Sequence, residues 1–520
     1  MWTDLTTVEG TLDCKPPFSF YFDLVGSCWK TAGQTNSLPL HRICTLARKQ
    51  GATFVVLETA LSRAHVRAEI DALDKTQGGG GAAEAISISF FSGDADPTDI
   101  AAVADRSFLG QAVVINYRPP EKSEFSHSYV FEGILPPPTM PSSVGRDKLL
   151  LNNYISSSKD YGCVIGGRTF TVSGVYYCQQ NRTHHVCAHA SLRMALSSAT
   201  KEISADDINK TLGIAPPCDG LNLGQIVQVI EGEGLSADVV DCRKLERETY
   251  ISILGSIIES GDQALLVFTT GHQAGGIPQE HVVLVYGHTR NSDEWHPQAI
   301  PAYAGPGSAQ YLPASNWIDH FLIHDDNFGP YFTLSSQALE FDPDVRAHWI
   351  VAIRKQQLKV RPEVAEATSA AVLTNFLRSL ATVATGRWFD YVTQNTWNYV
   401  LRTILVTRDD YVAHLQAVRG HDGSAIKPPE LERLAALPDR FWMVEFSLPS
   451  IFTGNRTKLG EVLIDAQADL PIDVNKAVVG LRLPKVLIVR DPEAGVLNLG
   501  GCSLDAHAPI FRRPESGPEW

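Results

Sequence analysis

The sequence lacks several features that would place it in common protein classes. No two of its nine cysteines form a Cys-x-x-Cys pair, and their number is odd. This argues against a disulfide scaffold or a zinc ribbon and favours a reducing compartment. No stretch approaches the ~20 consecutive apolar residues of a transmembrane helix. The first residues show neither the basic region nor the apolar region of a secretory signal. We therefore expect a cytoplasmic protein that does not bind a membrane.

Positive charge is also scarce. The chain has 44 Lys and Arg against 58 Asp and Glu, a net charge of −14. This balance argues against a general nucleic-acid binder or a protein that binds anionic lipid. The glycine run at 78–81 is not followed by Lys-Ser or Lys-Thr, so it is not a phosphate-binding loop. We expect no nucleic-acid partner and no cofactor.

The 520 residues are too many for one ordinary core, and we divide them into three domains. Residues 1–145 alternate strand-like runs with helical patterns, which indicates a small N-terminal α/β domain. A proline-rich segment at 135–143 closes this domain. Residues 146–340 form the central domain, and residues 341–520 a C-terminal α+β domain. Overall we expect an α+β protein.

The C-terminal domain shows both kinds of periodicity. Leu373, Phe376 and Leu377 share the spacing of one buried helix face. Apolar runs at 440–448 and 477–489 each predict a strand.

The segment "HHVCAH" at 184–189 holds the first candidate for chemistry. "CAHASLRMALSSA" predicts a helix that begins at or just before Cys187, because Ala188, Leu192 and Ala195 share one face. A thiol in the first helical turn meets the positive end of the helix dipole and unpaired backbone N–H groups. Both stabilise the reactive thiolate.

The elements expected after Cys187 keep a definite order. Helices are predicted at 204–213, 220–235 and 251–261, and strands at 263–268, 279–288 and 320–332. His281 begins the second of these strands, and Asp325 and Asp326 follow "HFLIH" in the third. The order is thus a cysteine at a helix start, several helices, a histidine at a strand start, and an acid.

This order resembles the papain-like cysteine peptidases, most closely the bacterial C39-like branch. Their helix begins C-G-P-A-[SA], their histidine strand reads H-x-V-x-V-x-G, and their acid lies in a D-P-x-x-G turn. The matching stretches here are "CAHAS", "HVVLVYG" and "HDDNFG", and the resemblance covers about 175–335. It implies a central papain-like (C39-like) cysteine hydrolase domain with a domain on each side.

The resemblance also implies roles for individual residues. Cys187 is the expected nucleophile, and His281 is the base and acid, as befits a group that titrates near neutral pH. Asp325 takes the family's acid position and orients the imidazole. Asp326 stands where the family has proline, so it is the alternative acid. This chain has "CAHA" where the family has "CGPA".

An oxyanion hole needs a further donor. Papain-like enzymes use a glutamine about six residues before the cysteine, together with the cysteine N–H. In this chain Asn181 stands six residues before Cys187, Gln180 seven before and Gln179 eight before. We favour Gln180, with Asn181 and Gln179 as the alternatives.

A metal centre is the main rival for this segment. His184, His185, Cys187 and His189 can all bind metal. Cys187 and His189 are two positions apart, which on a helix puts them on nearly opposite faces. We therefore expect no metal, with His189 turned away or packed and the other two histidines in a loop. Elsewhere, His65 and Glu69 are spaced as a solvated helical pair.

The expected activity is hydrolysis of a peptide or isopeptide bond in a protein or peptide substrate. Acyltransferases, deamidases and transglutaminases use the same Cys-His-Asp set and differ in the acceptor, so they remain open. A catalytically inactive binding module also remains open. The flanking domains exceed what catalysis needs, and we expect them to select the substrate or to bind a regulatory protein.

Overall fold

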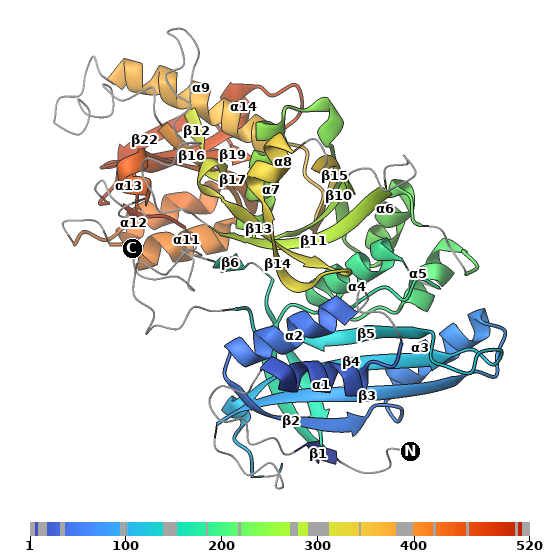
Figure 1. The fold of residues 1–520 in the computed structure, drawn as a ribbon. Helices are drawn as coiled ribbons and strands as arrows, with labels where there is room; N and C mark the ends of the chain where they lie inside the picture. Colours follow the sequence, from blue (N-terminus) through green and yellow to red (C-terminus); the bar gives the residue numbers. More distant parts are fainter. Residues whose placement is uncertain are drawn as a thin grey trace.

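The computed structural model combines helices with three principal sheets, which confirms the expected α+β class (Figure 1). It describes residues 6–8, 18–31, 37–93, 100, 102–138, 153–155, 157–183, 186–216, 220–270, 279–289, 311–342, 345–380, 399–419, 423–453, 457–504 and 508–511. In this described part, no helix has the length and apolar character needed to cross a bilayer.

The N-terminal part is built on a five-stranded sheet in which each strand pairs with the next along the chain. Its elements are β1 (Thr6–Val8), α1 (Phe18–Cys28), α2 (Leu38–Lys49), β2 (Ala52–Thr59), α3 (Ala64–Thr76), β3 (Ala82–Ser92), a 3₁₀ turn (Asp105–Ser107), β4 (Phe108–Arg118) and β5 (His127–Ile134). All four pairings are antiparallel. The expected α/β domain is therefore wrong in type, because antiparallel neighbours need no crossover helices and make this part α+β.

Helices cover both faces of this sheet. Along β4, Ala112 and Val114 face the core that includes α1 and α2, whereas Val113 and Ile115 face the core under α3. This alternation is the two-residue period of a strand, and it explains why the run from Ala112 to Ile115 is apolar throughout.

A hairpin beyond the proline-rich segment also packs on this sheet. It consists of β7 (Lys159–Ile165) and β8 (Arg168–Gly174). Phe170 of the hairpin lies edge-on to Phe91 of β3, with ring centroids 5.4 Å apart. Packing of the N-terminal core thus continues past the expected boundary at residue 145.

The central sheet has the order β14-β13-β11-β10-β15-β9, with β6 also paired to β11, and its pairings are antiparallel. Its strands are β6 (Asn153–Ile155), β9 (Ser236–Asp241), β10 (Gln263–Thr270), β11 (Gln279–Thr289), β13 (His320–Asp325), β14 (Gly329–Ser335) and β15 (Val345–Arg354). The run at 320–332, expected as one strand, is a hairpin of β13 and β14.

Helices lie on both sides of this sheet. They are α4 (Cys187–Ala199), α5 (Ala205–Leu212), α6 (Leu223–Gly232), α7 (Arg247–Glu259) and α8 (Ser336–Phe341), with 3₁₀ turns at Cys242–Lys244 and Ala314–Trp317. The predicted ends of α5 are confirmed, and capping explains both. The Ser204 side chain accepts a hydrogen bond from the Asp207 N–H, and Gly213 ends the helix with a φ of +64°. In β11, Leu284 faces the core with α4, and Val283 faces the core with α7.

Two strands near the expected boundary at residue 340 each join the sheet on the other side of that boundary. β15 follows that position but lies between β10 and β9 inside the central sheet. Conversely, β12 (Tyr311–Pro313) precedes it but runs parallel to β16 (Tyr399–Thr407) at the edge of the C-terminal sheet. The central and C-terminal parts are therefore joined through strand pairing as well as through the chain.

The C-terminal sheet has the order β12-β16-β17-β19-β20-β21-β22. The remaining elements are α9 (Pro362–Leu380), α11 (Arg408–Ala417), α12 (Pro428–Arg433), a 3₁₀ turn (Leu434–Ala436), β17 (Arg440–Ser447), α13 (Pro449–Thr453), β18 (Thr457–Lys458), β19 (Gly460–Asp465), α14 (Val474–Ala477), β20 (Val478–Leu483), β21 (Val486–Arg490), β22 (Leu497–Gly501) and β23 (Ala508–Pro509). The run at 477–489, expected as one strand, is a hairpin that turns at Lys485, whose φ is +62°.

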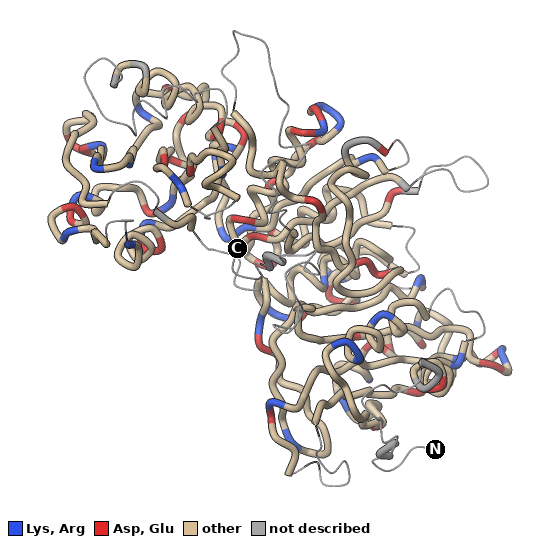
Figure 2. Tube along the Cα trace, turned by 60° about the vertical axis from the view of Figure 1, so that its left-hand side comes forward, with Lys and Arg blue, Asp and Glu red and all other residues tan. Residues whose placement is uncertain are grey.

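Charged side chains of alternating sign form a row of ion pairs in the interior of the C-terminal part. Figure 2 colours the acidic and basic positions along the chain trace. In order, the members of the row are Arg402, Glu445, Lys458, Glu461 and Arg482. All five are at most 2% exposed. Arg402 also pairs with Glu259 at the end of α7, so the row of charges reaches into the central part. Charges this deeply buried are tolerated because each has a partner of opposite sign.

Candidate active site

Cys187 is the first residue of α4, and the residue before it, Val186, has an extended backbone. The helix start therefore presents backbone N–H groups and the positive end of the helix dipole to the thiol, as the sequence predicts. Cys187 is half-buried, whereas the other six described cysteines are buried. Burial raises the pKa of the Cys163 and Cys178 thiols to about 12, so those thiols stay protonated near neutral pH.

His281 is the third residue of β11 and pairs in register with Phe268 of β10. The Phe268 ring lies edge-on to the imidazole, with centroids 5.7 Å apart, and helps to fix its orientation. Burial alone would lower the pKa of His281. Hydrogen bonds with Asp325 and Cys187, together with the charges of Asp325 and Asp326, raise that pKa well above its usual value.

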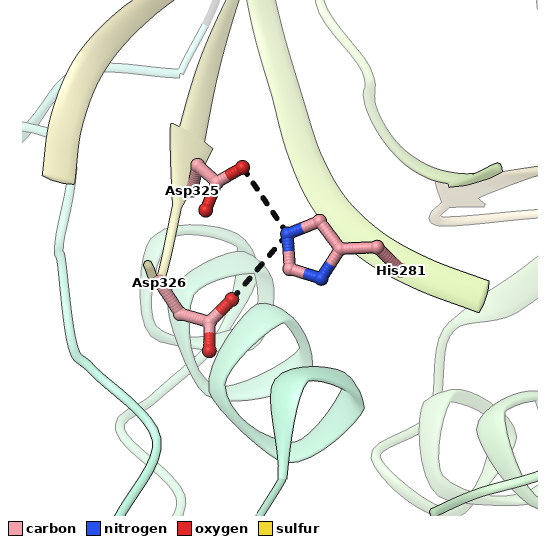
Figure 3. Close-up of side chains that lie close together, drawn as sticks. All are labelled: His281, Asp325 and Asp326. Atoms are coloured by element: carbon pink, nitrogen blue, oxygen red, sulfur yellow. Dashed lines mark hydrogen bonds and ion pairs between the residues drawn. The ribbon is translucent and has the colours of Figure 1, made fainter. Parts of the chain in front are cut away.

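The imidazole of His281 faces two carboxylates. Figure 3 shows the His281 Nε2 atom facing Asp325 and Asp326, with the second ring nitrogen pointing away from both. Nε2 is 3.1 Å from Asp325 Oδ2 and 3.6 Å from Asp326 Oδ1. Because Nε2 faces the carboxylates, Nδ1 is the nitrogen available to Cys187.

The two aspartates differ in their surroundings. Asp325 ends β13, and its Oδ1 atom accepts the N–H groups of Asn327 at 2.8 Å and Phe328 at 3.3 Å. Asp326 is fully buried, and neither of its carboxylate oxygens has a hydrogen-bond partner among the described residues. Burial and the neighbouring Asp325 charge raise the pKa of Asp326 to about 7, although the His281 charge acts against them. Of the two, Asp325 is the anchored, hydrogen-bonding carboxylate.

The Tyr177 hydroxyl helps to hold this turn. It donates to the backbone carbonyls of both Asp325 and Asp326, each at 3.3 Å. Tyr177 is fully buried and carries no catalytic-motif signal in the sequence. Tyr177 and Asp325 are 148 residues apart in the sequence, so local sequence patterns cannot predict their contact.

Of the histidines around Cys187, His189 is the one that the structure describes. His189 is fully buried, and its Nε2 atom is 2.9 Å from Asn209 Oδ1 of α5. It is therefore a packed side chain, as expected. His184 and His185 lie outside the described residues.

A different group could hold a cation. The ligand atoms of His281, Asp325 and Asp326 lie within 4.8 Å of one another. The Nε2 to Oδ2 distance of 3.1 Å is also that of an ordinary charge-assisted hydrogen bond. The geometry of these three side chains therefore fits an oriented histidine as well as a set of cation ligands.

The three candidates for the oxyanion donor point in different directions. Gln179 is buried, and its Oε1 atom accepts the Val130 N–H of β5 at 3.0 Å. Asn181 is buried, and its Nδ2 atom donates to Glu69 of α3 at 3.3 Å. Gln180, between them, lines the cleft that contains Cys187.

Gln180 also contacts the turn that carries the acids. Its Nε2 atom donates to Asn327 Oδ1 at 3.2 Å. A glutamine amide has two N–H donors, so this bond orients the side chain and uses one of them. Asn327 is a residue that the motif comparison did not single out.

A cleft of about 1600 Å³ runs over the site. Its lining includes Leu221, Leu223 at the start of α6, and Trp349 of β15. Phe328 and Phe332 lie at its edge, are 50% and 37% exposed, and stack with their centroids 5.6 Å apart. A cleft of this volume offers a bound ligand apolar side chains in the same lining as the thiol.

Comparison of the chain with models of known protein families finds no match, and comparison with curated proteins finds none either. The functional argument therefore depends on the geometry of the site.

Proposed function

We propose that this protein is a cysteine peptidase of the papain-like, C39-like kind, which hydrolyses a peptide or isopeptide bond. One observation carries the proposal: the His281 ring, hydrogen-bonded to Asp325 through Nε2, lines the same cleft as Cys187, and Cys187 is among the groups that raise the pKa of this histidine. Cys187 begins a helix packed against β11, and Asp325 lies on β13, the neighbour of β11. This arrangement supports Cys187 as the nucleophile, His281 as the base and Asp325 as the acid that orients the base.

In the first half of the reaction, His281 holds the proton of Cys187 and the thiolate sulfur attacks the carbonyl carbon of the substrate. The carbonyl electron pair moves to oxygen and gives a tetrahedral oxyanion. As this intermediate collapses, the C–N bond breaks and His281 protonates the leaving amine. The acyl group remains on Cys187 as a thioester.

In the second half, water attacks the thioester carbonyl while His281 takes one of its protons. The C–S bond then breaks, the thiol is restored and the carboxylic acid leaves. Asp325 keeps its position throughout, since its Oδ1 atom accepts two backbone N–H groups and its Oδ2 atom faces the imidazole. It stabilises the imidazolium and fixes the ring.

The N–H of Cys187 and the second N–H of Gln180 are the proposed oxyanion donors. Gln180 is the candidate of the three that lines the cleft, and its bond to Asn327 holds the amide in place. Such preorganised donors are worth a factor of about 10²–10³ in rate each.

Intact-mass analysis after treatment with chloroacetamide tests the proposal. We expect Cys187 to be alkylated in preference to the other cysteines, because the described ones are buried. His281→Ala should slow alkylation of Cys187, because the base that takes the proton from the thiol is lost. Cys187→Ala should abolish peptidase activity without unfolding the chain. Cys178→Ala, which removes a buried thiol, is the matched control. Equal labelling of several cysteines would rule the proposal out.

A metal hydrolase is the alternative that the cluster of His281, Asp325 and Asp326 raises. Activity measured after prolonged dialysis against a strong chelator separates the two. The thiol mechanism predicts that activity persists, and a metal-dependent reaction predicts its loss with recovery on adding zinc.

We extend the proposal to the setting of the enzyme. The described cysteines are free thiols, which supports a reducing, cytoplasmic compartment. The N-terminal and C-terminal parts, which lie on either side of the cleft-bearing part, are the proposed contact regions for a protein substrate or a regulatory protein.

A further inference from the structure

The segment that carries Gln180 is attached to the N-terminal sheet. Tyr177 and Gly133 of β5 exchange two backbone hydrogen bonds, of 2.9 and 2.8 Å. Two residues later, Gln179 N donates to Val130 O at 2.8 Å, and the Gln179 side chain accepts the Val130 N–H at 3.0 Å. The segment therefore runs along β5 as an additional edge of that sheet up to the residue before Gln180.

A second attachment follows directly after Gln180. Asn181 donates through Nδ2 to Glu69 Oε1 at 3.3 Å, and the Tyr129 hydroxyl donates to the same oxygen at 2.8 Å. Glu69 lies in α3 and is only 5% exposed. The expectation of a solvated His65–Glu69 pair is thus wrong: His65 instead lies 3.2 Å from Glu132, and Glu69 points into the interior.

We propose that Glu69 and Gln179 are positioning residues for the oxyanion hole. Through these two residues the N-terminal part of the chain holds a component of the active site in place. This inference rests on the proposed function. The side chains on either side of Gln180 are directed into the N-terminal part, and this direction leaves Gln180 facing the cleft. Gln179 and Asn181, the alternative oxyanion donors, are anchors in this arrangement.

The physical reason is that an oxyanion donor acts only if its N–H is already in place when charge develops on the substrate oxygen. A displacement of about 1 Å can cost as much as ~10²-fold in rate. Gln180 lies in a segment outside regular helix or strand, so the neighbouring anchors supply the rigidity that the local backbone does not.

Two probes that react with the same thiol separate positioning from simple stability. Alkylation by chloroacetamide forms a C–S bond and expels chloride in one displacement, with no oxyanion. Acylation by 4-nitrophenyl acetate passes through a tetrahedral oxyanion and then releases 4-nitrophenolate. Both reactions need Cys187 and His281, but only acylation needs the donor at Gln180.

The test compares both rates in the full-length chain. Gln180→Ala, which removes the donor itself, is the reference variant. Its acylation rate should fall about 10²-fold, and its alkylation rate should stay within about twofold of the wild-type rate. Glu69→Ala and Gln179→Ala should each lose tenfold or more in acylation and also keep alkylation. Glu69→Gln retains an oxygen acceptor for Asn181 and should recover most of the acylation rate. Tyr129→Phe, which removes the other bond to Glu69, is the matched control and should change neither rate.

The outcomes are distinguishable. A wild-type chain that shows no preferential alkylation of Cys187 contradicts the proposed function itself. If the wild type reacts, the inference is overturned when the anchor variants lose both rates together, when they lose neither, or when Gln180→Ala leaves acylation unchanged. Thermal unfolding of each variant is recorded alongside. Should Glu69→Ala fail to fold, Gln179→Ala and Glu69→Gln carry the same test.

Discussion

The Ser191 hydroxyl donates a 2.9 Å hydrogen bond to the backbone carbonyl of Val282. Ser191 lies one helical turn after Cys187, and Val282 directly follows His281. The bond therefore ties the helix that begins with the nucleophile to the strand that carries the base. Both atoms are buried, so little solvent competes for the bond.

Ser191→Ala tests this connection. We expect the free energy of unfolding to fall by about 1 kcal/mol, the usual contribution of one hydrogen bond. We also expect slower alkylation of Cys187 by chloroacetamide, because the thiol and the imidazole lose part of their alignment. Ser197→Ala removes another buried hydroxyl from α4, far from the thiol, and should lower stability without slowing alkylation. Equal alkylation rates in the two variants would contradict this role for Ser191.

Substitution of each aspartate by asparagine separates their roles. Asp325→Asn should lower kcat by about 10²–10⁴-fold, because the carboxylate that orients and stabilises His281 is lost. Asp326→Asn should cost less than about tenfold, since the His281–Asp325 bond remains. Steady-state kinetics on a peptide substrate at fixed pH give both values. A larger loss in Asp326→Asn would assign the acid to that residue instead.

The buried Asp326 predicts how stability depends on pH. Its pKa is raised from 3.8 to about 7 in the folded chain, so between these values the folded state binds the proton more tightly than the unfolded state. The corresponding stability is fully present below about pH 4 and is lost as pH rises through 7. Relative to Asp326→Asn, which does not titrate, the wild type should lose about 4 kcal/mol between pH 4 and pH 8. Urea unfolding of both proteins across this range checks the difference, and parallel curves would exclude the raised pKa.

The buried charges of the C-terminal sheet predict a large stability effect. Arg402→Met should lower the free energy of unfolding by about 3–5 kcal/mol, because Glu259 and Glu445 lose a partner of opposite sign in the interior. Chemical denaturation measures the change. Lys359→Met breaks an exposed pair with Asp469 and should cost less than about 1 kcal/mol. Similar losses in the two variants would mean that the row of charges contributes little.

Local patterns in the sequence predict several of the helices and strands in this structure, above all in the central part. Residues close together in the chain form the capping pairs of α5 and α6 and the two-residue alternation of β10 and β11. Such local patterns can be recognised in the sequence alone. For the same reason the sequence places Cys187 at a helix start and His281 near a strand start. Turns are harder to find: the apolar run at 477–489 hides the hairpin at Lys485, because both of its strands are buried.

The sequence by itself determined the order of the chemical groups along the chain, from Cys187 to His281 to the Asp325–Asp326 pair. Only the tertiary structure decided between neighbouring candidates: Asp325 accepts two backbone N–H groups while Asp326 accepts none among the described residues, and Gln180 faces the cleft while Gln179 and Asn181 face the N-terminal part. The same holds for the antiparallel N-terminal sheet and for β15, which joins the central sheet from beyond residue 340. Hydrophobic periodicity records which face of an element is buried, but the partner that buries it is chosen by packing across distant parts of the chain.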